Sequence, residues 1–143
     1  MAKLGRYSAD RKKIEALTAA KTVEVPDCGT VFTLGTAAGF AVVLPDAADC
    51  GNGWWCKFVV KVAPDGGDYT IDASSGDGNN LHGVAVTSEH DQGTAAHTNS
   101  TAVDQIALKD GKSKIGDQVE LVTDGSLWYV VAHVQEHDAL TLG

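Results

Sequence analysis

The clearest pattern along the chain is an alternation of apolar and polar positions over residues 54–62, WWCKFVVKV. A period of two is what a strand with one buried face imposes on a sequence. Lys57 and Lys61 fall on the face opposite Phe58, so the second face of this strand is at least partly solvated. Parallel strands are usually covered on both faces, whereas antiparallel sheets can leave one face in water. The alternation therefore predicts the central strand of an antiparallel sheet.

Shorter segments of the same kind recur along the chain between turn residues. Asp124 and Gly125 form a hairpin signal, and residues 64–68 (PDGGD) form a second one. About eight short strands between Gly, Asn and Asp turns are typical of a sandwich or barrel. We therefore predict an all-β fold, a sandwich or barrel of about eight short antiparallel strands. Besides 54–62, the strand segments are 21–25, 30–34, 40–44, 69–73, 81–86, 104–108, 118–122 and 127–134.

The two ends of the chain lack this alternation. Ser8 is a candidate N-cap for a short helix over residues 9–20, with Ile14 and Leu17 on one face. We expect residues 1–21 to form an N-terminal arm and short helix, residues 22–134 the β-domain, and residues 135–143 a tail. Residues 87–101 are the least hydrophobic stretch of the body, so we expect a long surface loop there that is either mobile or in contact with a partner.

Charge is spread unevenly over the 143 residues, whose net charge is −8. An acidic chain lacks the cationic footprint that phosphate binding requires, so we expect no direct contact with nucleic acid. No apolar run approaches the roughly 20 residues that span a bilayer, so we expect no membrane insertion. A basic arm on an acidic body is typical of docking onto another surface. Six of the 11 Lys and Arg residues lie within the first 21 positions: Lys3, Arg6, Arg11, Lys12, Lys13 and Lys21.

Candidate reactive groups do not form a recognisable motif. His133 and His137 are four residues apart, but the sequence HVQEH differs from the HExxH of zinc proteases. The acidic residues near His90 and His97 lack metal-ligand spacing, and the aspartate-rich loops lack the DxDxDG pattern of calcium loops. We therefore expect a protein without enzymatic activity, metal or cofactor.

The tryptophans divide between the two faces of the predicted sheet. Trp54 and Trp128 are expected in the core, as is Cys56, and the odd number of three cysteines favours free thiols. Trp55 falls on the opposite face from Trp54. An exposed Trp is costly in a soluble monomer, so Trp55 is a candidate for a contact with a partner or another subunit.

The order of these segments resembles a β-module seen in bacteriophage structural proteins. The resemblance rests on the turn and strand patterns TLG…FAVVLPDAADCGNGWWCKFVVKVAP (33–64), GDYTIDAS (67–74), LHGV (81–84) and GDQVELVTDGSLWYVV (116–131). A similar succession occurs in phage tail-fibre, spike and head-decoration proteins, where the final hairpin carries DG(S)xW. None of these patterns is catalytic, so the resemblance is to the class and does not single out one member.

Within this class the chain looks most like a small capsid decoration (cement) protein, because the module follows directly on a short basic arm. The resemblance implies a homotrimer that binds the major capsid protein on the surface of the virion, after synthesis in the host cytoplasm. The alternatives are a tail-fibre, spike or baseplate-associated adhesion module that contacts a host surface, and a small cytoplasmic domain unrelated to virions. The residues expected to dock on the capsid protein or an adjacent subunit are Lys3, Leu4, Arg6, Tyr7, Arg11 and Lys12.

Overall fold

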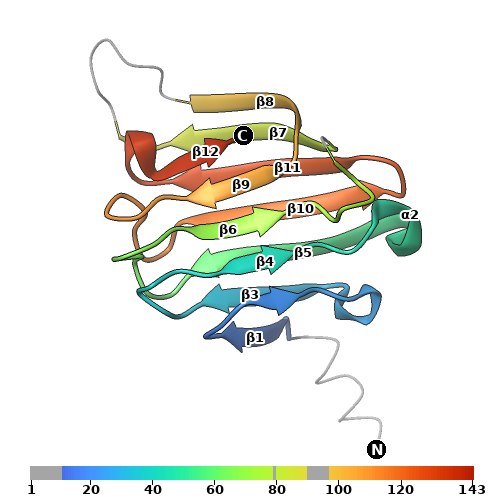
Figure 1. Cartoon of the computed structure of the whole chain (residues 1–143), viewed down its shortest axis with the longest axis horizontal. Coiled ribbons are helices and arrows are strands. Elements are labelled where there is room, and N and C mark those ends of the chain that lie inside the picture. Colours follow the sequence, from blue (N-terminus) through green and yellow to red (C-terminus); the bar gives the residue numbers. More distant parts are fainter. Residues whose placement is uncertain (1–10, 79, 90–96) are drawn as a thin grey trace, which may run out of the picture.

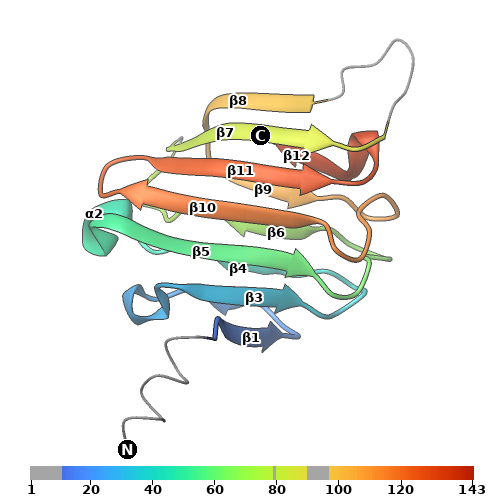
Figure 2. The same ribbon diagram turned by 180° about the vertical axis from the view of Figure 1, so that it is seen from behind.

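The chain folds into two β-sheets that lie face to face (Figures 1 and 2), as seen in a computed structural model that describes residues 11–78, 80–89 and 97–143. The larger sheet has the order β1 (Lys13–Leu17), β3 (Thr30–Leu34), β5 (Asn52–Val60), β10 (Gln118–Asp124), β11 (Trp128–Val134), β7 (Leu81–Thr87), β8 (His97–Val103). The smaller sheet has the order β12 (Leu140–Leu142), β9 (Gln105–Leu108), β6 (Tyr69–Asp72), β4 (Ala41–Val43), β2 (Lys21–Thr22). A short helix, α2 (Ala47–Cys50), and 3-10 turns at Val25–Asp27 and His137–Ala139 complete the described elements.

The core lies between the sheets and is built from the alternating positions that the sequence predicts. On β5, Cys56 and Phe58 are fully buried, and Trp54 is 4% exposed. Phe58 stacks on Phe32 with ring centroids 5.2 Å apart. Trp54 meets Trp128 edge to face at 5.5 Å, an arrangement that suits two indole rings. The predicted all-β sandwich and its buried face are thus confirmed.

Half of the strand pairings are parallel, so the prediction of an antiparallel sheet is wrong in this respect. From β1 to β6 the chain alternates between the larger and the smaller sheet. A strand that returns to its sheet after one pass through the other sheet runs in its original direction, which makes β3 parallel to both β1 and β5. In the smaller sheet β4 is parallel to β2 and β6 for the same reason. Residues 64–68 therefore cross between the sheets and do not close a hairpin.

Two of these crossings pack backbone against backbone. A Cβ atom placed on Gly39, between β3 and β4, would lie 2.3 Å from the carbonyl oxygen of Asp68. A Cβ atom on Gly67, between β5 and β6, would lie 2.4 Å from the carbonyl oxygen of Ala38. Only glycine fits at either position, so the two crossings can stack.

The Tyr69 hydroxyl joins the same two crossings from the core side. It accepts a hydrogen bond from the Thr36 N–H at 3.0 Å, and its single proton is shared between the carbonyl oxygens of Thr36 and Val62, 2.7 and 2.8 Å away. Burial raises the pKa of this phenol. Tyr69 therefore ties backbone groups of both crossings together, alongside the Gly39 N–H that donates to the Thr36 carbonyl at 3.0 Å.

The predicted N-terminal helix is wrong over residues 13–17, which form β1. Ile14 and Leu17 were expected on one helical face, but Ile14 is 65% exposed and Leu17 is 6% exposed. The pairing with β3 outweighs the weak helical pattern, because a short isolated helix is marginal in water. Lys21 adds ion pairs to Glu15 at 2.9 Å and Asp27 at 3.6 Å, and the Glu15 hydrogen bond raises its pKa.

Two other terminal or loop expectations change in the same way. Residues 97–101, expected in a surface loop, belong to β8, which pairs with β7. In the expected C-terminal tail, Leu140–Leu142 pair with β9 as an edge strand of the smaller sheet. Backbone pairing at a sheet edge can take up polar segments that carry no clear alternation.

Candidate functional site

The outward-facing positions of the larger sheet form three rows that cross its strands. The strand register defines each row, since residues directly opposite one another lie on the same face. The first row contains Trp55, Val122, Tyr129 and His82. The second contains Ile14, Val31, Lys57, Glu120, Val131 and Val84. The third contains Ala16, Thr33, Val59, Gln118, His133 and Val86. We call this surface the binding face.

Large apolar side chains are exposed on this face where a solvated sheet would carry polar ones. Tyr129 is 43% exposed, Val131 48%, Val86 41% and Val122 39%. This exposure can be recognised in the sequence, because these residues alternate with apolar residues that point into the core. Both faces of their strands are therefore apolar. Sequence reasoning singled out Trp55 alone and missed its neighbours.

A depression of about 430 Å³ lies at one end of the binding face, between β1 and β10. The half-buried Trp55 indole lies against Gly29, where a Cβ atom would be 3.8 Å from indole carbon Cζ2. Gly29 presents no side chain, so Lys12, next to β1, and Trp55 line one depression. The structure thus brings together two residues that the sequence analysis named separately. The remaining lining residues are Lys57, Glu120 and Val122.

The charged side chains that line the depression have no polar partners within the described part of the protein. Within the described residues, Lys12, Lys57 and Glu120 form no ion pair and no side-chain hydrogen bond. Lys57 and Glu120 lie opposite each other on β5 and β10, in the middle row. Two charges of opposite sign at the centre of an apolar surface are available to a partner with matching groups.

Tyr129 is held in place by the turn that follows β10. Its hydroxyl donates to Asp124 Oδ2 at 2.7 Å, while the N–H groups of Ser126 and Leu127 donate to Oδ1 at 2.8 and 2.9 Å. The Leu127 N–H, followed by the Tyr129 hydroxyl, lowers the pKa of Asp124. The same carboxylate raises the pKa of Tyr129. The aromatic ring is therefore positioned on the surface by hydrogen bonds rather than by burial.

The other predicted partner-binding residues divide between described and undescribed segments. Arg11 is exposed, next to Lys12. Lys3, Leu4, Arg6 and Tyr7 lie outside the described residues.

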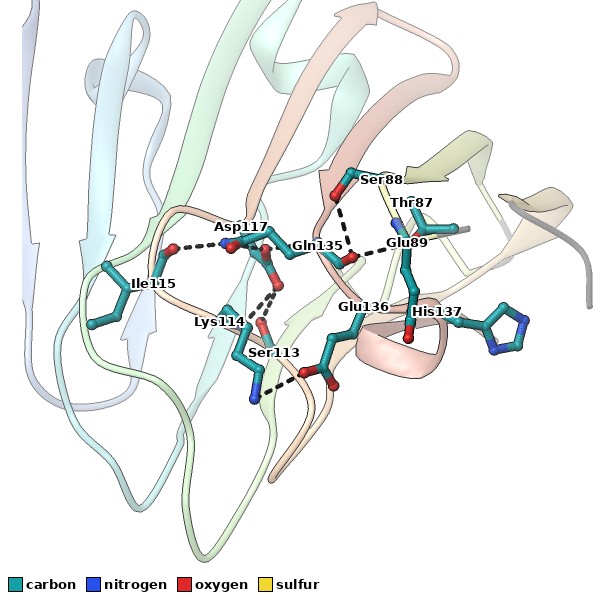
Figure 3. Close-up of polar contacts among 10 residues, drawn as sticks. All are labelled: Thr87, Ser88, Glu89, Ser113, Lys114, Ile115, Asp117, Gln135, Glu136 and His137. Carbon is teal, nitrogen blue, oxygen red and sulfur yellow. Dashed lines mark hydrogen bonds and ion pairs between the residues drawn. The ribbon is translucent and has the colours of Figure 1, made fainter. Parts of the chain in front are cut away.

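Asp117, which is buried, belongs to a separate polar cluster that Figure 3 shows. Its Oδ2 accepts from the Ser113 hydroxyl at 3.0 Å and from the Lys114 N–H at 2.9 Å. Its Oδ1 accepts from the backbone and side-chain amides of Gln135, both at 3.0 Å. All four hydrogen bonds come from the protein itself. Asp117 therefore joins the β9–β10 crossing to the chain that leaves β11, which is a structural task.

Several of the acidic side chains considered as metal ligands form hydrogen bonds within the fold. In the described part of the chain no three His, Cys, Asp or Glu side chains group so as to hold a metal ion. Asp68 is hydrogen bonded to Lys109, and Asp77 accepts from Ala47 and Trp128.

The three cysteines are free thiols in the structure. Burial is the main factor that raises the pKa of Cys50 to about 11, and burial also raises the pKa of Cys56 well above its ordinary value. The thiolate is the nucleophilic form, so neither Cys50 nor Cys56 is activated as a nucleophile.

Searches among protein-family models, curated proteins and solved structures find no match to this chain. Among its described residues, none of the helices has the length and apolar character needed to cross a lipid bilayer.

Proposed function

We propose that the protein is a bacteriophage head decoration (cement) protein, which binds and stabilises the major capsid protein lattice as an oligomer. The observation that carries the proposal is the position of Lys12, in the basic N-terminal segment, beside Trp55 on the binding face. A cationic segment and a half-buried, outward-facing aromatic then belong to one docking surface. The order of strand and turn patterns in residues 33–131 supports the same class of protein.

Such a protein acts by binding alone. The basic segment, with Lys3, Leu4, Arg6, Tyr7 and Arg11, contacts capsid protein or an adjacent subunit, and Lys12 and Trp55 continue that contact on the body. Many weak contacts repeated across a lattice add avidity and resist the pressure of packaged DNA. The protein is then made in the host cytoplasm and resides on the capsid surface.

Co-sedimentation of the purified protein with expanded, decoration-free heads tests the proposal. The structure directs the choice of truncation: residues 11–143 retain β1, whereas a deletion through residue 20 removes a strand of the larger sheet. We expect saturable binding by the full chain and weaker binding by the truncated chain. Lys12→Glu is expected to weaken binding, while Lys112→Glu, at another exposed lysine outside the binding face, serves as the matched control.

Unchanged affinity of the truncated chain would contradict a docking role for residues 1–10. Absence of binding by the full chain would contradict decoration altogether. The same protein would then be tested on host cells and isolated surface glycans, as expected for a tail-associated adhesion module.

A further inference from the structure

We propose that the binding face docks on the same face of a second copy of this chain, about a twofold axis parallel to the strands between β5 and β10. The inference goes beyond capsid binding and does not depend on it, because it follows from the strand order, the register and the outward side chains of the larger sheet. It differs from the homotrimer that the resemblance to decoration proteins implies. In such an isologous contact each copy offers the same patch to the other.

The axis exchanges strands in pairs. In the order β1, β3, β5, β10, β11, β7, a rotation about the line between β5 and β10 places β5 over β10 of the second copy. It also places β3 over β11 and β1 over β7. The register then determines which side chains meet, row by row. Aligned packing of twisted sheets rotates the strands by about 30°, so the match is best near the axis.

Charge complementarity lies at the axis. Lys57 on β5 and Glu120 on β10 share the middle row, on either side of the axis. Lys57 of each copy therefore faces Glu120 of the other, which gives two reciprocal ion pairs. Neither side chain has an ionic partner among the described residues of its own copy. Like charges in these positions would oppose the contact.

Apolar side chains meet apolar side chains around this centre. In the first row Trp55 comes to lie on Val122 of the second copy, and in the middle row Val31 lies on Val131. Ile14, the most exposed large side chain of β1, lies on Val84. The exposed members of these pairs, Val122, Val131 and Ile14, are thus covered by less exposed apolar neighbours, which removes them from water.

The size of the face indicates how strong the contact is. Six strands at about 4.8 Å spacing and three rows about 7 Å apart give a surface of roughly 25 by 20 Å on each copy. The total is about 1,000 Å², at the lower end of specific interfaces. We therefore expect a dimer whose population depends on concentration and on salt, since ion pairs are screened.

Charge exchange provides a test that a structural effect cannot imitate. Lys57→Glu alone places two glutamates against two glutamates across the axis, and Glu120→Lys alone places lysines against lysines. We expect each single variant to lose roughly tenfold or more in self-association, measured by sedimentation equilibrium at low salt. An equimolar mixture of the two single variants regains both ion pairs in a heterodimer, and the double variant K57E/E120K regains them in a homodimer.

Two controls separate association from folding. Thermal unfolding and circular dichroism show that each variant is folded before it is mixed. Thr141→Glu adds a charge to an exposed outward position of the smaller sheet and is expected to leave self-association unchanged. A wild-type chain that stays monomeric, a trimer in place of a dimer, or single variants that fail to associate when mixed would each overturn the proposal. Trp55 belongs to both proposed contacts, so the dimer and the capsid contact compete for this part of the face. Binding to heads is therefore measured separately, and either contact can fail while the other stands.

Discussion

The two sheets bury equivalent inner faces but present different outer faces. On the larger sheet the outward positions include Trp55, Tyr129 and Val131, the last two exposed by almost half. On the smaller sheet one outward row reads Ala41, Thr70, Ala107 and Thr141, and the next includes Asp72 and Gln105.

The difference shows that alternate positions of one strand have separate roles. The inward side chains form the core, and the outward side chains determine what the surface can bind. Small and hydrogen-bonded side chains on the smaller sheet lose little by contact with water; Gln105, for example, donates to Asp72 at 2.7 Å. Aromatic and branched side chains on the larger sheet gain by being covered. Among the described residues, the outer face of the larger sheet therefore gains more from being covered than that of the smaller sheet.

The largest expected effect is the difference in unfolding free energy between substitutions on the inner and on the outer face of β5. Phe58→Ala removes a fully buried ring from β5 and is expected to lower the free energy of unfolding by about 3–5 kcal/mol. Lys57→Ala, one residue away on the binding face, is expected to change it by less than about 0.5 kcal/mol. Urea denaturation of both variants below the concentration of self-association measures the contrast. Comparable losses in the two variants would contradict the assigned parity.

The next effect concerns the cluster that joins the two sheets. Asp117→Ala leaves the Ser113 hydroxyl and the Gln135 N–H without their acceptor, so we expect a loss of about 3 kcal/mol in unfolding free energy. Asp65→Ala removes an exposed carboxylate and is the matched control, with a change near zero. Chemical denaturation measures both. A stable Asp117→Ala variant would show that the crossings hold without the cluster.

A smaller effect tests the backbone beneath the depression. Gly29 has φ of +78°, a conformation that costs other residues about 1–2 kcal/mol, so Gly29→Ala is expected to lose about that amount. The added Cβ atom lies in ordinary contact with the Trp55 indole, so tryptophan fluorescence should report a changed environment. Gly78→Ala, with open space around its Cβ position and no positive φ, is the control and is expected to be neutral.

The smallest effect is the pH dependence of the Asp124–Tyr129 pair on the binding face. The folded-state pKa of Asp124 lies below its ordinary value of 3.8, so its stabilisation is complete above that value and is lost as the pH falls through the lower folded value. The raised pKa of Tyr129 acts in the opposite sense, so its contribution is lost as the pH rises above 10.0 and through the folded value. Asp124→Asn and Tyr129→Phe should flatten the acid and alkaline limbs, respectively, of unfolding midpoints measured against pH. Unchanged limbs would show that the pair is not formed in solution.

Most residues of the binding face could be identified from the sequence. The order of strands that brings them together could not. The parity of residues 54–62 identified the buried and outward side chains of β5 correctly, because a period of two reports burial directly. The same parity on β10 and β11 marks Val122, Tyr129 and Val131 as outward and apolar. What brings them to Trp55 is the placement of β10 beside β5, and adjacency between strands distant in sequence leaves no local pattern.

The sequence by itself determined that the chain would form short strands with one buried face, separated by glycine and aspartate turns. Local alternation and turn chemistry are properties of neighbouring residues, so they can be read without the fold. Only the tertiary structure decided that strands alternate between two sheets and run parallel, and that residues 13–17 extend along β3 instead of coiling. Those outcomes depend on backbone pairing between distant segments, whose free energy outweighs weak local preference. The same pairing placed Val122 beside Trp55 and so created the binding face, and it brought Lys12 to the depression at Trp55.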